Sequence, residues 1–158
     1  MKYLVAYDGS EWSKEALKRA ASMSVHPDAT LTILTVAEPT ATFSYAGLTG
    51  DGIVDWHGES VPELQKQFKE HVESLGKKLL AQAEELVRDS GANYNLRLEF
   101  GSPRLTITEV AEEENTDVIV MGSRGLGAVK RLILGSVSDY TLHHAPCSVY
   151  ILRLPESD

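Results

Sequence analysis

Apolar and polar residues follow one another along this chain with two different periods. Short apolar or alternating runs, which are typical of strands, occur at 2–7, 30–36, 94–100, 117–122 and 147–152. Between them, apolar residues spaced three or four positions apart predict helices after Ser10, from Val61 to Gly91, after Ser102-Pro103 and over 136–144. Because a parallel strand pair needs a connection of about helix length, this alternation predicts an α/β fold in three layers, with helices on both faces of a parallel sheet.

The helix after residue 101 has the clearest opening signal. Ser102 is a favourable cap, Pro103 suits the first turn, and Asn115 is expected to end the helix. The residues expected on its apolar side are Leu105, Ile107, Val110 and Ala111.

One stretch, residues 38–59, has no clear period and contains four glycines. A loop of this length is uncommon in a compact domain, so we expect either a lid over a functional site or a variable surface loop. The rest of the pattern is continuous, and the 158 residues are a usual length for one domain spanning 1–158.

Composition narrows the classes of partner. The chain has 15 Lys and Arg against 23 Asp and Glu, a formal charge of −8, which opposes capture of a nucleic-acid backbone. The first apolar run is far shorter than the roughly 18 residues of a membrane span and lacks a signal-peptide cleavage region, so we expect a cytoplasmic protein with no membrane association. The single cysteine, Cys147, is expected to serve in packing, as are Trp12 and Trp56.

Two turns that follow predicted strands carry candidate chemistry. Asp8-Gly9-Ser10 follows the first strand, and Gly122-Ser123-Arg124-Gly125 follows the fourth. If these strands are neighbours, both turns face one crevice, the usual ligand site in such sheets. Asp8 is expected to contact that ligand or, alternatively, only to hydrogen-bond its own turn.

The helix predicted over 136–144 adds an anion site to this crevice. The first turn of a helix presents unpaired N–H groups and a partial positive charge, and Ser136 and Ser138 add hydroxyl groups. Glycines at 122, 125 and 135 would let the backbone approach a phosphate closely. His143 and His144, at the opposite end of this helix, are expected to be structural, and no metal site is predicted.

These residues also form a spaced motif. Gly122-x2-Gly125-x9-Gly135-Ser136 resembles the nucleotide-binding motif G-x2-G-x9-G-[ST] of the ATP-binding branch of the universal stress protein family. The resemblance extends over nearly the whole chain, through Asp8, DVIVMGSRG, GSVS and APCSVYIL, and only 38–59 lies outside it. It implies a five-stranded parallel sheet in the order 3-2-1-4-5, an adenine nucleotide alpha-hydrolase-like, Rossmann-like fold.

The resemblance further implies ATP, with or without Mg²⁺, lying across the first and fourth strands. It places Ala6, where some relatives have proline, and Val36 beside adenine, with Asp8 near ribose or a metal-bound phosphate. Met121 and Gly122 would line the adenosine. The residues implied around the phosphates are Gly125, Gly135, Ser136, Val137 and Ser138. Arg124, Lys130 and Arg131 lie outside the motif and would raise the local potential.

The function that follows is a nucleotide-binding regulatory module of the stress response, whose nucleotide state biases its association with unidentified proteins. No catalytic residue is identified, so any ATP hydrolysis is expected to be weak. One alternative is a slow Mg-dependent ATPase or phosphotransferase in which Asp8 holds the metal and Lys130 or Arg131 stabilises charge. Another is a binder of AMP, cyclic AMP or a flavin. The resemblance also implies a homodimer, and the C-terminal strand at 147–154 is a natural edge for pairing with its copy.

Overall fold

The computed structural model describes residues 1–38, 61–126 and 134–154, and the backbone alone over 61–65. Residues 39–59 of the segment expected to be a lid or a variable loop therefore lie outside the described residues. The described elements, in chain order, are β1 Lys2–Ala6, α1 Glu11–Met23, β2 Thr30–Ala37, α3 Val61–Val87, β3 Tyr94–Phe100, α4 Pro103–Glu113, β4 Val118–Gly122, α5 Ser136–His144 and β5 Ser148–Leu152.

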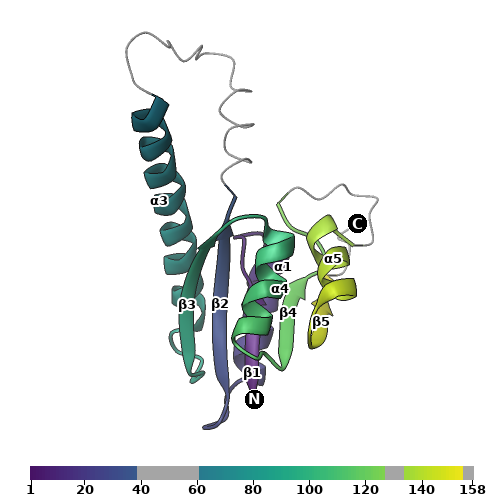
Figure 1. The fold of residues 1–158 in the computed structure, drawn as a ribbon. Helices are drawn as coiled ribbons and strands as arrows, with labels where there is room; N and C mark the ends of the chain where they lie inside the picture. Colours follow the sequence, from purple (N-terminus) through teal and green to yellow (C-terminus); the bar gives the residue numbers. More distant parts are fainter. Residues whose placement is uncertain (39–60, 127–133, 155–158) are drawn as a thin grey trace.

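The five strands form one sheet in the order β3-β2-β1-β4-β5, and every neighbouring pair is parallel. The predicted α/β fold and its strand order are thus confirmed, and the predicted strands match the observed ones to within one residue at either end. Figure 1 shows the strands fanning between the long helix α3 on one side and α5 with β5 on the other.

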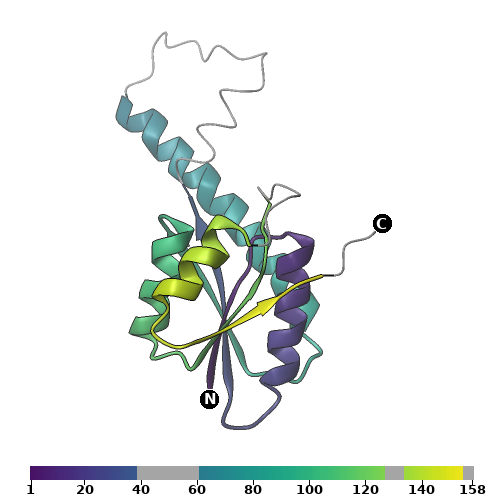
Figure 2. The same cartoon turned by 90° about the vertical axis from the view of Figure 1, so that its right-hand side faces the viewer.

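Helices cover both faces of the sheet, as the alternation of elements predicts. Figure 2 views the domain from the β5 edge, with α1 on one face and α4 and α5 on the other. The side chains of β1 and of Tyr7, the residue after it, divide between these faces: Tyr3, Val5 and Tyr7 belong to the core under α1 and α3, whereas Leu4 packs with α4. Because alternate strand residues point to opposite faces, two separate apolar cores result.

The helix ends follow local chemistry, with two departures from expectation at α4. Ser102 occupies the cap position but its side chain makes no capping hydrogen bond. Leu105, expected on the apolar side, is 48% exposed, and Thr106 is buried instead. A period of 3.6 residues cannot separate two adjacent positions near the edge of a helix face. Asn115, with φ of 51°, follows the last turn as expected.

The long helix α3 packs on β2, β3 and α1 through a narrow stripe. Val72, Leu80, Ala83 and Val87 are buried, while Leu75 remains 40% exposed. None of the helices in the described part of the chain is both long enough and apolar enough to cross a lipid bilayer.

Candidate functional site

A cavity of ≈ 660 Å³ lies at the carboxyl ends of β1, β2 and β4. Its walls come from these strand ends, from the beginning of α1, and from α3, α4 and α5. This volume falls in the usual range for small-molecule sites. The cavity lies where the strand order reverses, between β1 and β4, which is the position at which open α/β sheets bind ligands.

The structure brings all the binding residues named from the sequence to this one cavity. Four separate segments supply them, namely the ends of β1, β2 and β4 with their turns, and the start of α5. The lining includes Ala6, Asp8, Val36, Met121, Gly122, Gly125, Gly135, Ser136, Val137 and Ser138. Their contact with a ligand remains a prediction.

The carboxylate of Asp8 joins the two glycine-containing turns. Its Oδ1 accepts hydrogen bonds from Ser10, from the backbone N–H at 3.0 Å and from the hydroxyl at 2.6 Å. Its Oδ2 accepts from the backbone N–H of Leu126 at 3.2 Å. Asp8 therefore does hydrogen-bond its own turn, and it also holds the turn after β4 against the turn after β1.

The glycines of the motif are packed by the protein to different degrees. A Cβ on Gly125 would lie 2.6 Å from Oδ2 of Asp8, and a Cβ on Gly122 would lie 2.6 Å from Cβ of Trp12. A Cβ on Gly135 would meet nothing closer than 3.5 Å, an ordinary contact. Close approach by neighbouring side chains therefore explains the first two glycines, whereas Gly135 is not required by its protein neighbours.

Trp12 and Arg124 pack next to Gly122. The Arg124 guanidinium lies 5.5 Å from the centre of the Trp12 ring, which is within the range of a cation–π contact. Trp12 thus has the packing role expected of it. Arg124 also lines the cavity and supplies positive charge there. Lys130 and Arg131, the other cations named from the sequence, lie outside the described residues, as does Trp56.

The beginning of α5 is fixed to the end of β4 through the backbone of Ser123. The Ser123 carbonyl accepts from the N–H of Gly135 at 2.7 Å and from the hydroxyl of Ser138 at 2.9 Å. The Ser123 N–H donates to the carbonyl of Leu152, the last residue of β5, at 2.8 Å. These bonds hold the N–H groups of the first turn of α5 toward the cavity, where an anion could accept from them.

The two serines of this turn differ in what they can offer a ligand. Ser138 is 2% exposed, and its hydroxyl lies within hydrogen-bonding distance of the carbonyls of Ser123 and Gly135. Its single hydroxyl hydrogen is used inside the protein, so Ser138 offers a ligand its backbone N–H. Ser136 is exposed at the cavity rim, where both its hydroxyl and its N–H are accessible.

Several lining residues were not identified from the sequence. The apolar wall from α3 consists of Val72, Leu75 and Leu79, and helical periodicity does not show that their helix crosses a cavity. Glu38, just after β2, was included in the irregular segment at 38–59 although it lines the cavity. A charged residue directly after a buried strand is the signal that could have identified it.

Tyr7 forms part of the cavity wall that adjoins the core under α1 and α3. It is 2% exposed, and its buried hydroxyl has no hydrogen-bond partner among the described residues. Burial raises the pKa of this phenol above its ordinary value, with nearby Asp8 and Glu11 adding to the effect and Lys14 opposing it. The Tyr7 side chain is therefore neutral at physiological pH and adds no charge to the site.

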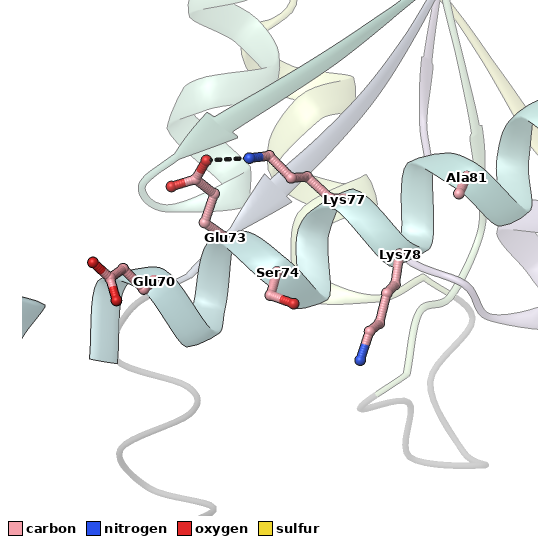
Figure 3. A pocket seen from close by; sticks show the side chains of 6 residues that line it. All are labelled: Glu70, Glu73, Ser74, Lys77, Lys78 and Ala81. Carbon is pink, nitrogen blue, oxygen red and sulfur yellow. Dashed lines mark ion pairs between the residues drawn. The ribbon is translucent and has the colours of Figure 1, made fainter. Parts of the chain in front are cut away.

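A second hollow, of ≈ 540 Å³, lies on the surface of α3 (Figure 3). The six described residues that line it all come from this one helix, and Glu73 pairs with Lys77 at 2.6 Å. The hydrogen bond from Lys77 lowers the pKa of the Glu73 carboxyl. Among the described residues no strand end or second element contributes to its lining, so this hollow is a solvated helix face rather than a candidate site.

A parallel α/β domain whose cavity lies where the strand order reverses belongs to the class of doubly wound, ligand-binding domains. The sequence model of the universal stress protein family matches residues 1–153. The chain therefore belongs to the universal stress protein family.

Individual relatives agree with this assignment. A Staphylococcus aureus protein named as a universal stress protein is 36% identical over 155 residues, which are 97% of this chain and 84% of the relative. The structure of UspA from Lactobacillus plantarum is 25% identical, with a TM-score of 0.75 and 97% of both chains covered. A universal stress protein solved in complex with cAMP is 23% identical, with a TM-score of 0.64, covering 97% of this chain and 96% of the other, and so shares the fold.

Proposed function

We propose that this universal stress protein belongs to the ATP-binding branch of its family and acts as a nucleotide-dependent regulatory module. The observation that supports this most strongly is that the spaced glycine–serine motif, Asp8 and the end of β2 line one cavity together with the first turn of α5. The relative solved with cAMP supports an adenine nucleotide as the class of ligand.

In the proposed complex, the base lies at the ends of β1 and β2, beside Ala6 and Val36. The polyphosphate lies at the other end of the cavity, against the first turn of α5. There the N–H groups of residues 136–138 and the hydroxyl of Ser136 would donate to phosphate oxygens, and Arg124 would add positive charge. Hydrogen bonds of this charge-assisted kind contribute about 1.5–3 kcal/mol each, so a few of them suffice for micromolar binding.

We propose binding rather than rapid hydrolysis because Asp8 is already engaged. Oδ1 already accepts two hydrogen bonds and Oδ2 accepts one, so most of the acceptor capacity of Asp8 holds the two turns together and only Oδ2 keeps a lone pair for a metal-bound phosphate or a water. Mg²⁺ would then be carried by the phosphates of the ligand, with its remaining positions filled by water.

We also propose that the protein is a homodimer that pairs through β5. This strand is at the edge of the sheet, and its outer side has no partner strand among the described residues. Exposed apolar side chains lie on it and on the neighbouring helix α5: Tyr150 is 38% and Leu142 48% exposed. Such an edge is a suitable template for pairing with a second copy.

Ser136→Asp is the variant that best tests nucleotide binding. An aspartate in the first helical turn favours helix α5 through the helix dipole, so the fold should be retained, while its charge opposes a phosphate at the same N–H groups. We expect the affinity for ATP, measured by isothermal titration calorimetry, to fall by about tenfold or more, a loss of about 1.4 kcal/mol.

Ser74→Asp is the matched control, because it introduces the same charge on the exposed face of α3, outside the cavity. Its affinity for ATP should equal that of the wild type. The proposal is wrong if wild-type protein freed of co-purified ligand does not bind ATP, and the site assignment is wrong if Ser136→Asp binds as tightly as Ser74→Asp.

A further inference from the structure

Glu38 is an acidic residue of the cavity lining that has no hydrogen-bond or ion-pair partner among the described residues. The residue directly follows β2, is half-buried and lines the cavity. Its carboxylate makes no hydrogen bond or ion pair with another described residue, in contrast to that of Asp8. A partly buried carboxylate is stabilised by a hydrogen-bond donor, so this position favours a ligand group that carries N–H.

The backbone beside Glu38 is also available to a ligand. The carbonyl of Leu34 accepts from the N–H of Tyr7, so the main-chain groups of Leu34 point toward β1. The carbonyl of Ala37 accepts from Gly101 and therefore points toward β3. Because these directions alternate along a strand, the N–H and carbonyl of Val36 point toward β1, which has already ended at Ala6.

The two ends of the cavity differ in charge. Glu38, with the N–H and carbonyl of Val36, lies at the end of β2, whereas Arg124 and the N–H groups that open α5 lie at the end of β4 and the start of α5. Two inter-strand spacings of about 4.8 Å separate β2 from β4, so the two ends are about 10 Å apart. A ligand that is anionic at one end and carries an N–H donor at the other fits this arrangement.

We propose that Glu38 determines base specificity by accepting a hydrogen bond from the exocyclic amino group of a 6-aminopurine. This inference rests on the proposed nucleotide-binding function and adds a residue that reads the base. A 6-oxopurine places a carbonyl oxygen where the amino group would be, so two acceptors would face each other. Loss of one hydrogen bond to a charged group predicts that ATP binds about tenfold or more tightly than ITP.

Glu38→Gln is the principal test because glutamine has nearly the same shape. Its amide can accept from an amino group or donate to a carbonyl, so the ATP-to-ITP affinity ratio should fall by about tenfold. Glu38→Leu removes both possibilities and should lower the ratio by a similar factor, leaving only the part of the preference that the Val36 backbone supplies. The ratio is the informative quantity, because loss of a negative charge near the ligand changes the affinities for ATP and ITP equally.

The measurement is calorimetric titration of each purified variant with ATP and with ITP, and Glu70→Gln is the control. Glu70 is exposed on α3 outside the cavity, so its replacement makes the same charge change and should keep the wild-type ratio. Equal wild-type affinity for ATP and ITP, or a preference that is undiminished in Glu38→Gln and Glu38→Leu, overturns the role of Glu38 but leaves nucleotide binding intact. Wild-type protein that binds neither nucleotide overturns the proposed function itself.

Discussion

Gly122 and Gly135 belong to the same spaced motif, but their surroundings predict different tolerance to a side chain. In Gly122→Ala the new methyl group would lie 2.6 Å from Cβ and 2.9 Å from the backbone carbon of Trp12, whereas in Gly135→Ala it would meet only contacts of 3.5 Å or more. We expect Gly122→Ala to lower the free energy of unfolding by about 1–3 kcal/mol through overpacking.

For Gly135→Ala we expect a loss of less than about 1 kcal/mol, since φ and ψ of −76° and 160° suit any residue and only the cap preference changes. Urea denaturation of both variants measures the difference. Equal losses would mean that the approach of α1 to Gly122 is not tight.

At this scale the sequence located the residues but not their neighbours. Motif spacing and strand position sufficed to name Gly122 and Gly125, because both follow a recognisable strand. The expected reason, room for a phosphate, omits the close approach of Trp12 and Asp8, which depends on how α1 packs against the turn after β4. One-dimensional spacing does not contain that packing.

At the level of elements, the Ser123 peptide ties β4, β5 and α5 together, and Ser138 completes this connection. In Ser138→Ala the carbonyl of Ser123 keeps the N–H of Gly135 but loses the hydroxyl, so we expect the free energy of unfolding to fall by about 1 kcal/mol. Because that hydroxyl is used internally, ATP affinity should change little. A loss of about tenfold in affinity without a loss of stability would instead indicate that the hydroxyl donates to phosphate.

The boundaries of α5 and β3 could be predicted to the residue because each has a clear local signal. Ala145-Pro146 ends α5, and polar and apolar residues alternate throughout β3. The exposure of Leu105 could not be predicted, since a 3.6-residue period does not separate it from its neighbour Thr106, which is the one buried. The α3 wall of the cavity was missed for a similar reason. Periodicity predicts that Val72 and Leu79 lie on the face of α3 that packs against the sheet, but it does not predict that a cavity lies between this face and the strand ends.

At the level of the whole molecule, sheet order and cavity location follow from each other. Once β1 lies between β2 and β4, the ends of three strands and the start of α5 converge on one edge of the domain. The order itself was expected from family resemblance, because alternation of strands and helices is compatible with several parallel orders. The same order leaves β3 and β5 as the two edges, and only one of them is proposed to pair.

The two edges allow a matched test of the proposed dimer. Tyr150 lies at the middle of β5, so antiparallel pairing about a two-fold axis places it near its own copy, where two like charges would repel. We expect wild-type protein at micromolar concentration to sediment as a dimer and Tyr150→Asp to sediment as a monomer. Leu96→Asp on β3 is the control, because Leu96 is also 38% exposed but lies on the opposite edge, and it should remain dimeric. A monomeric wild type, or a Tyr150→Asp variant that stays dimeric, would exclude pairing through β5. The strand has only five residues, so its central residue lies inside any antiparallel pairing of β5 with a second copy of itself.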